Sequence, residues 1–393
     1  MDSAILGELE LEFAPNQNFE NVVRLGKEEL LRFYKESDCS MLPCGKAEKV
    51  KHRALDPNTR LLSLDVGGSV LKMAIVSPTV FDVVFSRTKP LSAGTVDESF
   101  FANIAEWSCV QARKYAEENC IPEKDLSFLV GVTFSFPLTP NNELITMSKG
   151  FDIATELKGV NLLQLLRRQF SNIQMDCAFS VRGIINDSVA VYLTNSAYGA
   201  GDDFTLIVGT GTNACLSLNS ADESILINAE LGFLGKDFIR FSKFDLFDST
   251  AGPNLPLERV TAGKCVPQVL KRVLDYYKVP VSSHCEFNGK LLSNILEEKD
   301  CHYFGTRYAL VKEITKILLR RASFYLSAAL MSIAHLTGKA NLSKVRVGFV
   351  GSFLANITFY QEMTQKFAGG KIQLHYLRAS HLKGAAIHTY NSL

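Results

Sequence analysis

The chain lacks an excess of charge of either sign, because 42 Lys and Arg stand against 41 Asp and Glu, a formal net charge of +1. So little net charge gives no long-range field that would attract nucleic acid or an anionic membrane. The first residues, MDSAILGELELEF, are acidic and lack the basic flank and long apolar core of a signal peptide. The longest apolar stretch, around 322–336, contains Ser, Tyr and His, which favours a buried helix over a membrane span. We therefore expect a cytoplasmic protein with no membrane span and no direct nucleic-acid partner.

The chain also lacks paired cysteines. Its nine cysteines are scattered without a CxxC pair, and an odd number cannot all pair within one chain. Reduced thiols fit this pattern better than a disulfide framework or a zinc site. A hydrophobic content of 47% and a charged content of 21% are ordinary for a soluble globular protein, and 393 residues suffice for two domains.

What the chain does contain is one pattern that occurs twice. Residues 61–76 (LLSLDVGGSVLKMAIV) and residues 204–218 (FTLIVGTGTNACLSL) each give an apolar strand, a glycine-rich turn with a small hydroxyl residue, and a second strand. Glycine lets backbone N–H groups approach phosphate oxygens and takes up φ > 0 where a turn needs it, and Ser or Thr adds a donor. A plain hairpin would explain either turn alone. Two such hairpins in matching places favour a polyphosphate site, with Asp65 holding Mg²⁺ directly or through water.

The order of the predicted elements indicates a duplication. The first half reads βββαβαβ, and the second half begins again at residue 204 with a strand, a turn and a strand. A duplicated α/β unit with helices flanking each sheet fits this order. The predicted strands are 61–65, 70–76, 80–86, 126–134, 177–185, 224–228 and 344–350, and the predicted helices are 19–37, 101–112, 161–170, 258–278, 308–337 and a last one that begins near Lys383-Gly384.

Asn186 and Asp187 follow an apolar strand and open a helix. Both residue types are favoured helix caps, so a capping role alone would explain them. The functional interpretation makes Asp187 a general base. A hydroxyl that attacks a γ-phosphate must lose its proton, and a carboxylate within hydrogen-bond range can take it.

Other segments suit a polyol ligand. The strand end at 131–137 (GVTFSFP) and the segment 148–151 (SKGF) carry small hydroxyls and a lysine. The segment 228–233 (NAELGF) and Glu258 offer carboxylates, each of which can accept hydrogen bonds from two sugar hydroxyls. A strand end, a surface loop and solvated acids would explain the same residues without a ligand.

Taken in order, these segments resemble the hexokinase family. The pieces LDVGGS, GVTFSFP, SKGF, IINDSVA, GTGTNAC and NAELGF follow the family order with family-like spacing. The likeness extends from Ser40-Met41-Leu42-Pro43 to Gly384-Ala385-Ala386 and is that of a divergent, fungal hexokinase-like member. It implies an α/β fold of two lobes, the actin-like ATPase fold (a duplicated ribonuclease H-like fold) with a central cleft. The small lobe would be 62–186 with the C-terminal helix 380–393, and the large lobe would be 19–61 and 187–379.

The resemblance also implies roles for individual residues. Asp187 would be the base that activates the 6-hydroxyl of a hexose, with glucose as the expected substrate, hexose 6-phosphate as the product, and ATP with Mg²⁺ as the donor. The sugar pocket would be lined by Ser135, Ser148, Lys149, Asn186, Asn213, Glu230 and Glu258. The nucleotide would meet Asp65, Gly67, Gly68, Ser69, Lys72, Thr210, Gly211, Gly351 and Ser352, with Asp65 next to Mg²⁺ through water. The protein would act as a monomer or homodimer.

Departures from the family pattern gather at the nucleotide end. The first turn of the family usually reads D-x-G-G-T-N-x-R, whereas this chain has Ser69 in place of Thr, Val70 in place of Asn and Lys72 in place of Arg, and Lys lacks the planar fork of Arg. Val350 replaces an Asp, and the segment 380–384 (SHLKG) replaces a glycine-rich turn. Two alternatives to a hexose kinase therefore stay open. One is a weak or inactive sugar-binding regulator derived from the family, and the other is a hexosamine kinase that acts on N-acetylglucosamine.

Overall fold

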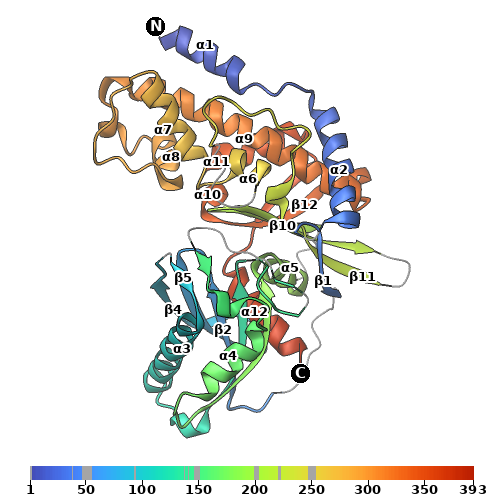
Figure 1. The fold of residues 1–393 in the computed structure, drawn as a ribbon, viewed down its shortest axis with the longest axis vertical. Helices are drawn as coiled ribbons and strands as arrows, with labels where there is room; N and C mark the ends of the chain where they lie inside the picture. Colours follow the sequence, from blue (N-terminus) through green and yellow to red (C-terminus); the bar gives the residue numbers. More distant parts are fainter. Residues whose placement is uncertain are drawn as a thin grey trace. The chain divides into compact units, whose positions relative to one another are not determined.

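The computed structural model divides into two compact units (Figure 1). Unit 1 comprises residues 1–42, 202–219 and 228–376, and unit 2 comprises residues 43–201, 220–227 and 377–393. The structure describes residues 2–37, 39–46, 55–92, 94–136, 138–139, 141–145, 151–198, 203–219, 223–246 and 254–393. The division groups residues 43–61, 187–201, 220–227 and 377–379 with unit 2, whereas the prediction placed them in the large lobe. The lobe limits themselves stay a prediction.

Unit 2 is built on a five-stranded sheet in the order β4-β3-β2-β6-β8. β2 is antiparallel to β3 and parallel to β6, and β6 is parallel to β8. The inner strands are buried on both faces, so their sequences are apolar runs rather than alternating ones. The bounds are β2 (Thr59–Val66), β3 (Val70–Val76), β4 (Val83–Pro90), β6 (Ser127–Phe134) and β8 (Ala178–Asn186).

Helices cover both faces of this sheet. Phe128, Val130 and Val132 of β6 share a core with α3 (Glu98–Glu118) and α4 (Leu162–Ser171). Alternate residues point to the other face, where α12 (Ser380–Asn391) packs against β2, β6 and α5 (Asp187–Ala197). A Cβ built on Gly131 would lie 2.5 Å from the Ala385 carbonyl oxygen. Glycine at this position therefore lets α12 lie close against the sheet.

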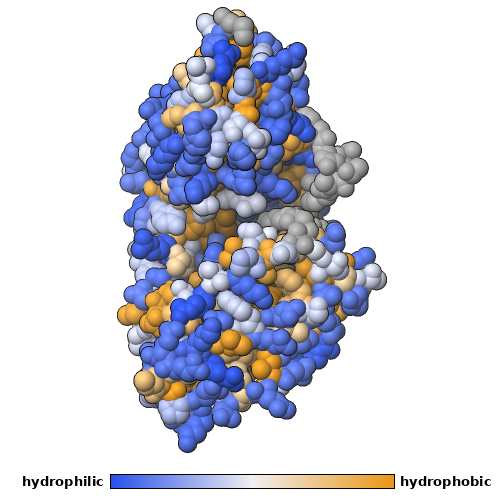
Figure 2. Space-filling model, turned by 90° about the vertical axis from the view of Figure 1, so that its left-hand side faces the viewer, coloured by the Kyte–Doolittle hydropathy of each residue, from blue (hydrophilic) through white to orange (hydrophobic). Residues whose placement is uncertain are grey.

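The remaining elements of unit 2 are short. β5 and β7 form a small parallel pair, and β1 and β11 lie almost wholly within this unit. Figure 2 shows one face of the molecule, on which apolar side chains are interspersed among hydrophilic ones. The bounds are β1 (Leu42–Lys46), β5 (Thr95–Val96), β7 (Asp152–Ile153), β11 (Ser224–Asn228), and two 3₁₀ turns, η1 (Glu123–Asp125) and η2 (Thr155–Leu157).

Unit 1 contains the second hairpin, β9 and β10, and two parallel strands beside it. β9 pairs with β10 on one side and with β12 on the other, and β12 pairs with β13. The strand order β10-β9-β12-β13 places the end of β12 next to the end of β9. The bounds are β9 (Phe204–Val208), β10 (Thr212–Asn219), β12 (Val345–Val350) and β13 (Ile372–Tyr376).

A long helix, α9 (Tyr308–Leu336), forms the centre of unit 1, and α1, α2, α6, α7, α8 and α11 pack against it (Figure 1). Among the described residues, this region alone is long and apolar enough to cross a membrane, and 94% of its most apolar window is buried inside the protein. The predicted buried helix is therefore present. The bounds of the others are α1 (Asp2–Phe13), α2 (Phe19–Glu36), α6 (Pro256–Thr261), α7 (Val266–Tyr276), α8 (Gly289–Leu296), α10 (Ser352–Ala355), α11 (Thr358–Phe367), and the 3₁₀ turns η3 (Leu231–Phe233), η4 (Cys301–Tyr303), η5 (Gly305–Arg307) and η6 (Lys339–Asn341).

The predicted order βββαβαβ is confirmed for the five-stranded sheet of unit 2 with α3 and α4, whereas the two-residue strands β5 and β7 were not predicted and several boundaries differ from those expected. The strand predicted at 80–86 begins at Val83, because Phe81 takes a positive φ of 51° and ends the preceding turn. The helix predicted at 258–278 is broken between Thr261 and Val266, where backbone N–H groups bond elsewhere. The last helix begins at Ser380 rather than near Lys383.

Candidate functional site

Three parallel strands of unit 2 end at the same edge of the sheet. Val66 of β2 lies opposite Phe134 of β6, which lies opposite Asn186 of β8. The edge therefore brings together residues that follow or end these strands, and ligands of open α/β sheets bind at such carboxyl ends. The predicted residues at this edge are Asp65, Gly67, Gly68, Ser69, Ser135, Asn186 and Asp187.

Asn186 and Asp187 join β8 to α5. The Asn186 side chain caps the helix, since its Oδ1 accepts hydrogen bonds from the Ser188 N–H at 2.9 Å and from the Ser188 hydroxyl at 2.7 Å. Asp187 is half-buried as the first residue of α5. Asn186 is thus the N-cap of α5, and the Asp187 carboxylate is not needed for capping.

The first hairpin turns through Gly67, Gly68 and Ser69. The Gly67 N–H bonds the Val70 carbonyl at 3.1 Å, and a Cβ on Gly67 would lie 3.0 Å from the same oxygen. Gly67 does not take up a positive φ, and neither do Gly209 and Gly211 of the second hairpin. These turns therefore do not need left-handed glycines, and close approach of neighbouring groups is the feature that favours glycine at Gly67 and Gly211.

Asp65, which ends the apolar part of β2, sits in a cluster of donors. Its Oδ2 lies 2.9 Å from Nζ of Lys72 and 3.5 Å from Nδ1 of His381, and its Oδ1 accepts a hydrogen bond from the Thr133 hydroxyl at 3.1 Å. Asp65 is only 2% exposed. Burial alone would raise the pKa of this carboxyl, but His381 and Lys72 outweigh it and hold the pKa far below its usual range.

His381 lies in the first turn of α12 and interacts with both carboxylates of this edge. Burial alone would lower its pKa, but attraction to Asp65, a hydrogen bond with Asp65 and attraction to Asp187 raise it. Its second ring nitrogen, Nε2, is buried without a hydrogen-bond partner. Asp65, Asp187, Lys72 and His381 therefore form one charged group within unit 2.

The second hairpin, in unit 1, is held by backbone bonds from the segment that breaks the predicted helix. The Gly263 N–H donates to the Gly209 carbonyl at 2.8 Å, and the Lys264 N–H donates to the Thr210 carbonyl at 3.3 Å. The Thr212 N–H donates to Oε2 of Glu258 at 3.0 Å. The broken helix thus fixes the turn by three hydrogen bonds.

Gly351 closes the hairpin from the side of β12. Its φ is +103°, and a Cβ there would lie 2.3 Å from the Val208 carbonyl oxygen. Any other residue would collide with the backbone that leads into Gly209. The predicted residues Gly351 and Ser352 are therefore placed beside the second hairpin.

Predicted sugar-binding residues of unit 1 form a chain of hydrogen bonds. The Asn213 amide donates to Oδ1 of Asn228 at 2.9 Å, and the Asn228 amide donates to Oε1 of Glu230 at 2.7 Å. Glu230 takes the left-handed conformation with φ of 43°, which is costly for a non-glycine residue and typical of functional sites. Asn228 links the two predicted residues; it begins the segment 228–233 but was not among the predicted site residues.

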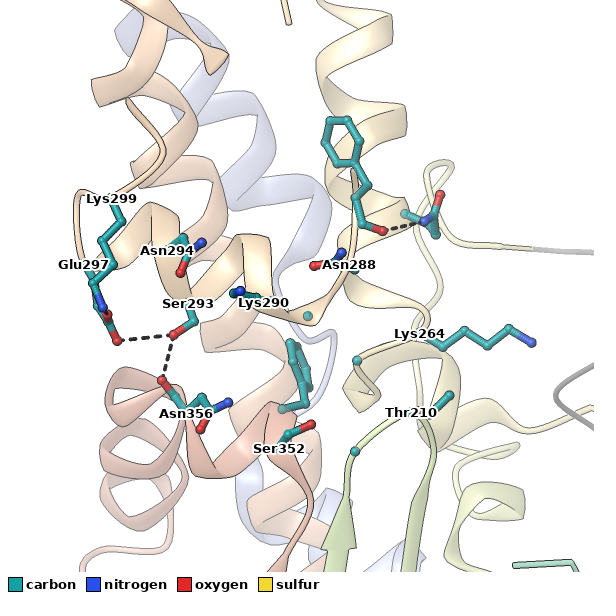
Figure 3. Close-up of a pocket in the computed structure, with 16 residues that line it drawn as sticks. Thr210, Lys264, Asn288, Lys290, Ser293, Asn294, Glu297, Lys299, Ser352 and Asn356 are labelled. Atoms are coloured by element: carbon teal, nitrogen blue, oxygen red, sulfur yellow. Dashed lines mark hydrogen bonds and ion pairs between the residues drawn. The ribbon is translucent and has the colours of Figure 1, made fainter. Parts of the chain in front are cut away.

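A pocket of about 830 Å³ opens beside the second hairpin and lies wholly within unit 1 (Figure 3). Gly209, Thr210 and Ser352 line it together with residues of α8 and the segment before α7. The volume lies in the range of small-molecule and cofactor sites. Its other lining residues are Gly263, Lys264, Gln268, Phe287, Asn288, Gly289, Lys290, Ser293, Asn294, Glu297, Lys299, Phe353 and Asn356.

The pocket has a positive balance of charge. Lys264, Lys290 and Lys299 line it against one acid, Glu297, which pairs with Lys299. Ser293 fixes the wall, since its hydroxyl donates to the Asn356 carbonyl at 2.9 Å (Figure 3). The arrangement suits an anionic ligand. These lysines were not predicted, because no motif surrounds them in the sequence.

Two of the predicted sugar residues, Ser148 and Lys149, lie outside the described residues. Lys72 is placed in the Asp65 cluster, and Gly211 packs against Glu258, whose carboxylate oxygen would be 2.5 Å from a Cβ at that position. Thr133 belongs to the segment 131–137 that was expected to suit a polyol, and its hydroxyl instead bonds Asp65, a contact that was not predicted. No group of three or more His, Cys, Asp or Glu within the described ranges has the arrangement of a metal site.

Comparison with known proteins assigns the family. Family models described as hexokinase match residues 37–198 and residues 203–390. The chain belongs to the hexokinase family. N-acetylglucosamine kinase 1 of Candida albicans is 24% identical over 84% of this chain and 83% of its own length. Hexokinase-1 of Mus musculus is 28% identical over 45% of this chain and 19% of its own length.

Solved hexokinase structures share the fold of this hexokinase-family chain. A hexokinase from Schistosoma mansoni complexed with glucose matches with a TM-score of 0.75 and 18% identity, and the match covers 99% of each chain. A second hexokinase crystal structure matches with a TM-score of 0.74. The predicted two-lobed α/β fold is thereby confirmed, while the central cleft and the roles of individual residues stay predictions.

Proposed function

We propose that the chain transfers the γ-phosphoryl group of ATP to the 6-hydroxyl of a hexose, with glucose as the expected substrate. The observation that carries the proposal is the carboxyl edge of the unit 2 sheet. There Asp187 follows β8 while the first glycine hairpin follows β2, and His381 interacts with carboxylates from both. A base beside a phosphate-facing turn is the minimum that phosphoryl transfer to an alcohol requires.

In this mechanism Asp187 accepts the proton of the 6-hydroxyl as its oxygen attacks the γ-phosphorus. The new O–P bond forms while the bond from the γ-phosphorus to the β–γ bridging oxygen breaks, and ADP leaves with that electron pair. The Asn186 cap fixes the first turn of α5 and hence the position of Asp187. A correctly placed general base contributes about 10²- to 10⁴-fold to the rate.

The hydrogen-bonded chain of unit 1 would bind the sugar. This chain contains the amide of Asn213 and the carboxylate of Glu230, and Glu258 bonds the neighbouring Thr212 N–H. A carboxylate can accept hydrogen bonds from two sugar hydroxyls at once. The pocket with Lys264 and Lys290 would hold the nucleotide, because ammonium groups neutralise phosphate charge. Kinases of this family generally use ATP and Mg²⁺, and Mg²⁺ supplies charge neutralisation on the phosphates when it is bound.

A hexosamine is the second candidate substrate. The observation that favours it is the likeness to the Candida albicans N-acetylglucosamine kinase 1, which extends over most of both chains. Glucose and N-acetylglucosamine share the 6-hydroxyl and differ at carbon 2. The same base and the same chemistry would serve both sugars.

The test is a coupled assay for ADP release with glucose and with N-acetylglucosamine on the purified chain. We expect Asp187→Ala and Asp187→Asn to lower kcat by about 10²-fold or more. Asp176→Asn, which changes an exposed acid of the loop before β8, serves as the matched control and should leave kcat unchanged. Full activity in both Asp187 variants would reject it as the base.

A sugar-binding regulator would give a different result. The wild-type chain would then release no ADP with either sugar, while glucose or N-acetylglucosamine would still raise its melting temperature, because a ligand that binds only the folded state stabilises it. Turnover with one of the two sugars excludes this alternative and identifies the substrate.

A further inference from the structure

The carboxylate of Asp65 is approached by donors of the protein itself at both of its oxygens. Lys72 and His381 approach Oδ2, and the Thr133 hydroxyl donates to Oδ1. These three groups come from β3, α12 and β6 and surround a residue with 2% of its surface exposed. Two of the three groups are basic side chains, and both lie beside the same carboxylate oxygen, Oδ2.

This donor set does not fit a Mg²⁺ site. Mg²⁺ requires near-octahedral oxygen ligands, keeps several waters, and is repelled by cations. The ammonium group of Lys72 lies 2.9 Å from Oδ2 of this carboxylate. Asp65 therefore does not fit the expected role as a metal-holding residue, even through water.

Lys72 and His381, the two basic groups beside Oδ2 of Asp65, carry nitrogen-bound positions that Asp65 does not occupy. An ammonium group carries three donors, and the side chain of Lys72 is 43% exposed. Nε2 of His381 is buried without an acceptor, and a buried donor without an acceptor calls for a ligand or water to complete it.

We propose that Lys72 and His381 bind phosphate groups of the nucleotide directly at the first hairpin, with Asp65 as their counter-ion rather than as a metal ligand. The inference rests on the proposed function, because it concerns the same nucleotide. Asp65 orients the two donors before the ligand arrives, so that little side-chain entropy is lost on binding. A nucleotide that meets fixed protein cations depends less on Mg²⁺ for its affinity than one that meets a metal-holding carboxylate.

The test is calorimetric titration of the full chain with the non-hydrolysable analogue AMPPNP, once in EDTA and once in excess Mg²⁺. For the wild type we expect the two dissociation constants to agree within about tenfold. Lys72→Met and His381→Ser should each weaken binding in EDTA by about 10- to 100-fold, the effect of removing one charge-assisted hydrogen bond. Lys89→Met, which removes an exposed cation from the neighbouring strand β4, is the matched control and should change neither constant.

Removal of one cation leaves Asp65 under-compensated and can unfold the unit, so a second pair of variants is needed. Asp65→Asn/His381→Ser and Asp65→Asn/Lys72→Met remove the carboxylate charge as well, and both should weaken metal-free binding relative to Asp65→Asn alone. Lys72→Arg keeps the cation and should restore most of the affinity.

Three results overturn the inference. The first is metal-free binding that is unchanged in the Lys72 and His381 variants. The second is Asp65→Asn abolishing the enhancement by Mg²⁺, which would make Asp65 a metal ligand. The third is nucleotide binding by the wild type only when Mg²⁺ is present. Sugar phosphorylation that persists alongside any of these leaves the proposed function standing, whereas absence of both AMPPNP binding and ADP release refutes the proposed function itself.

Discussion

The two glycine hairpins have the same sequence pattern but are held in different ways. The first hairpin, in unit 2, follows a buried carboxylate that is balanced by Lys72 and His381, so charged side chains organise it. The second hairpin, in unit 1, is fixed by backbone bonds from Gly263 and Lys264 and by the close approach of Gly351. In both hairpins the repeated pattern sets the strand–turn–strand shape, whereas other groups that hold the turn, such as His381 and Gly263, come from distant segments.

The largest expected effect concerns the backbone packing of the second hairpin. Gly351→Ala would place a Cβ 2.3 Å from the Val208 carbonyl oxygen at a φ of +103°. Backbone strain and steric overlap together should lower the free energy of unfolding by about 3 kcal/mol or more. Urea denaturation followed by circular dichroism measures the loss.

Gly209→Ala is the control for this prediction. A Cβ at Gly209 meets nothing nearer than 3.6 Å and needs no positive φ, so the cost should stay below about 1 kcal/mol. Equal destabilisation by the two substitutions would show that the second hairpin is not held by close backbone approach.

An intermediate effect is expected from the charged cluster of the first hairpin. Asp65→Ala leaves Lys72 and His381 without their counter-ion and leaves the Thr133 hydroxyl with only the Leu64 carbonyl as acceptor. Breaking a fully buried pair costs about 3–5 kcal/mol, but Lys72 is 43% exposed and can turn to water, so we expect about 2 kcal/mol. The same denaturation experiment checks it, and salt should reduce the loss because charges are involved. A loss that salt leaves unchanged would mean that packing, not charge, holds the first hairpin.

The sequence identified the parts of this comparison that lie within one segment. Asp65 stands beside Gly67 and Gly68 in one short motif, and Thr210 stands between two glycines in the other. Asn186-Asp187 was placed correctly at the start of a helix. The parts it missed come from segments far along the chain. Thr133 is 68 residues from Asp65, Lys264 belongs to a stretch predicted as helix interior, and His381 was expected before the last helix rather than within it.

These residues were missed because a motif encodes only local geometry. Packing between distant segments determines which charged side chain lies beside Asp65. Gly131 and Gly384 let α12 approach β6 and α5, and only this approach brings His381 to Asp65. Neither glycine is part of a phosphate motif. Likewise the helix break at Ala262–Cys265 has no strong sequence signal apart from Gly263 and Pro267, yet it supplies the N–H groups that hold the second hairpin.

The smallest expected effect is the pH dependence that His381 gives to the first hairpin. Its pKa in the folded state is raised above that of the unfolded chain, mainly because attraction to Asp65 overcomes burial. Its contribution to stability is therefore fully present below pH 6.5 and is lost as the pH rises through the folded pKa. Asp65 has a lowered pKa, so its contribution is present above about pH 4 and is lost in stronger acid.

The charged cluster should therefore contribute most between about pH 4 and 6.5. We expect His381→Asn to lower the unfolding free energy by about 1 kcal/mol at pH 5.5, and by less at pH 8.5. His388, whose pKa is lowered by burial, titrates in the opposite sense but is present in both proteins, so the difference between them isolates His381. Thermal melts of the two proteins across this pH range measure it. A difference that grows as the pH rises would show that His381 is neutral beside Asp65, and the first hairpin would then be held by Lys72 alone.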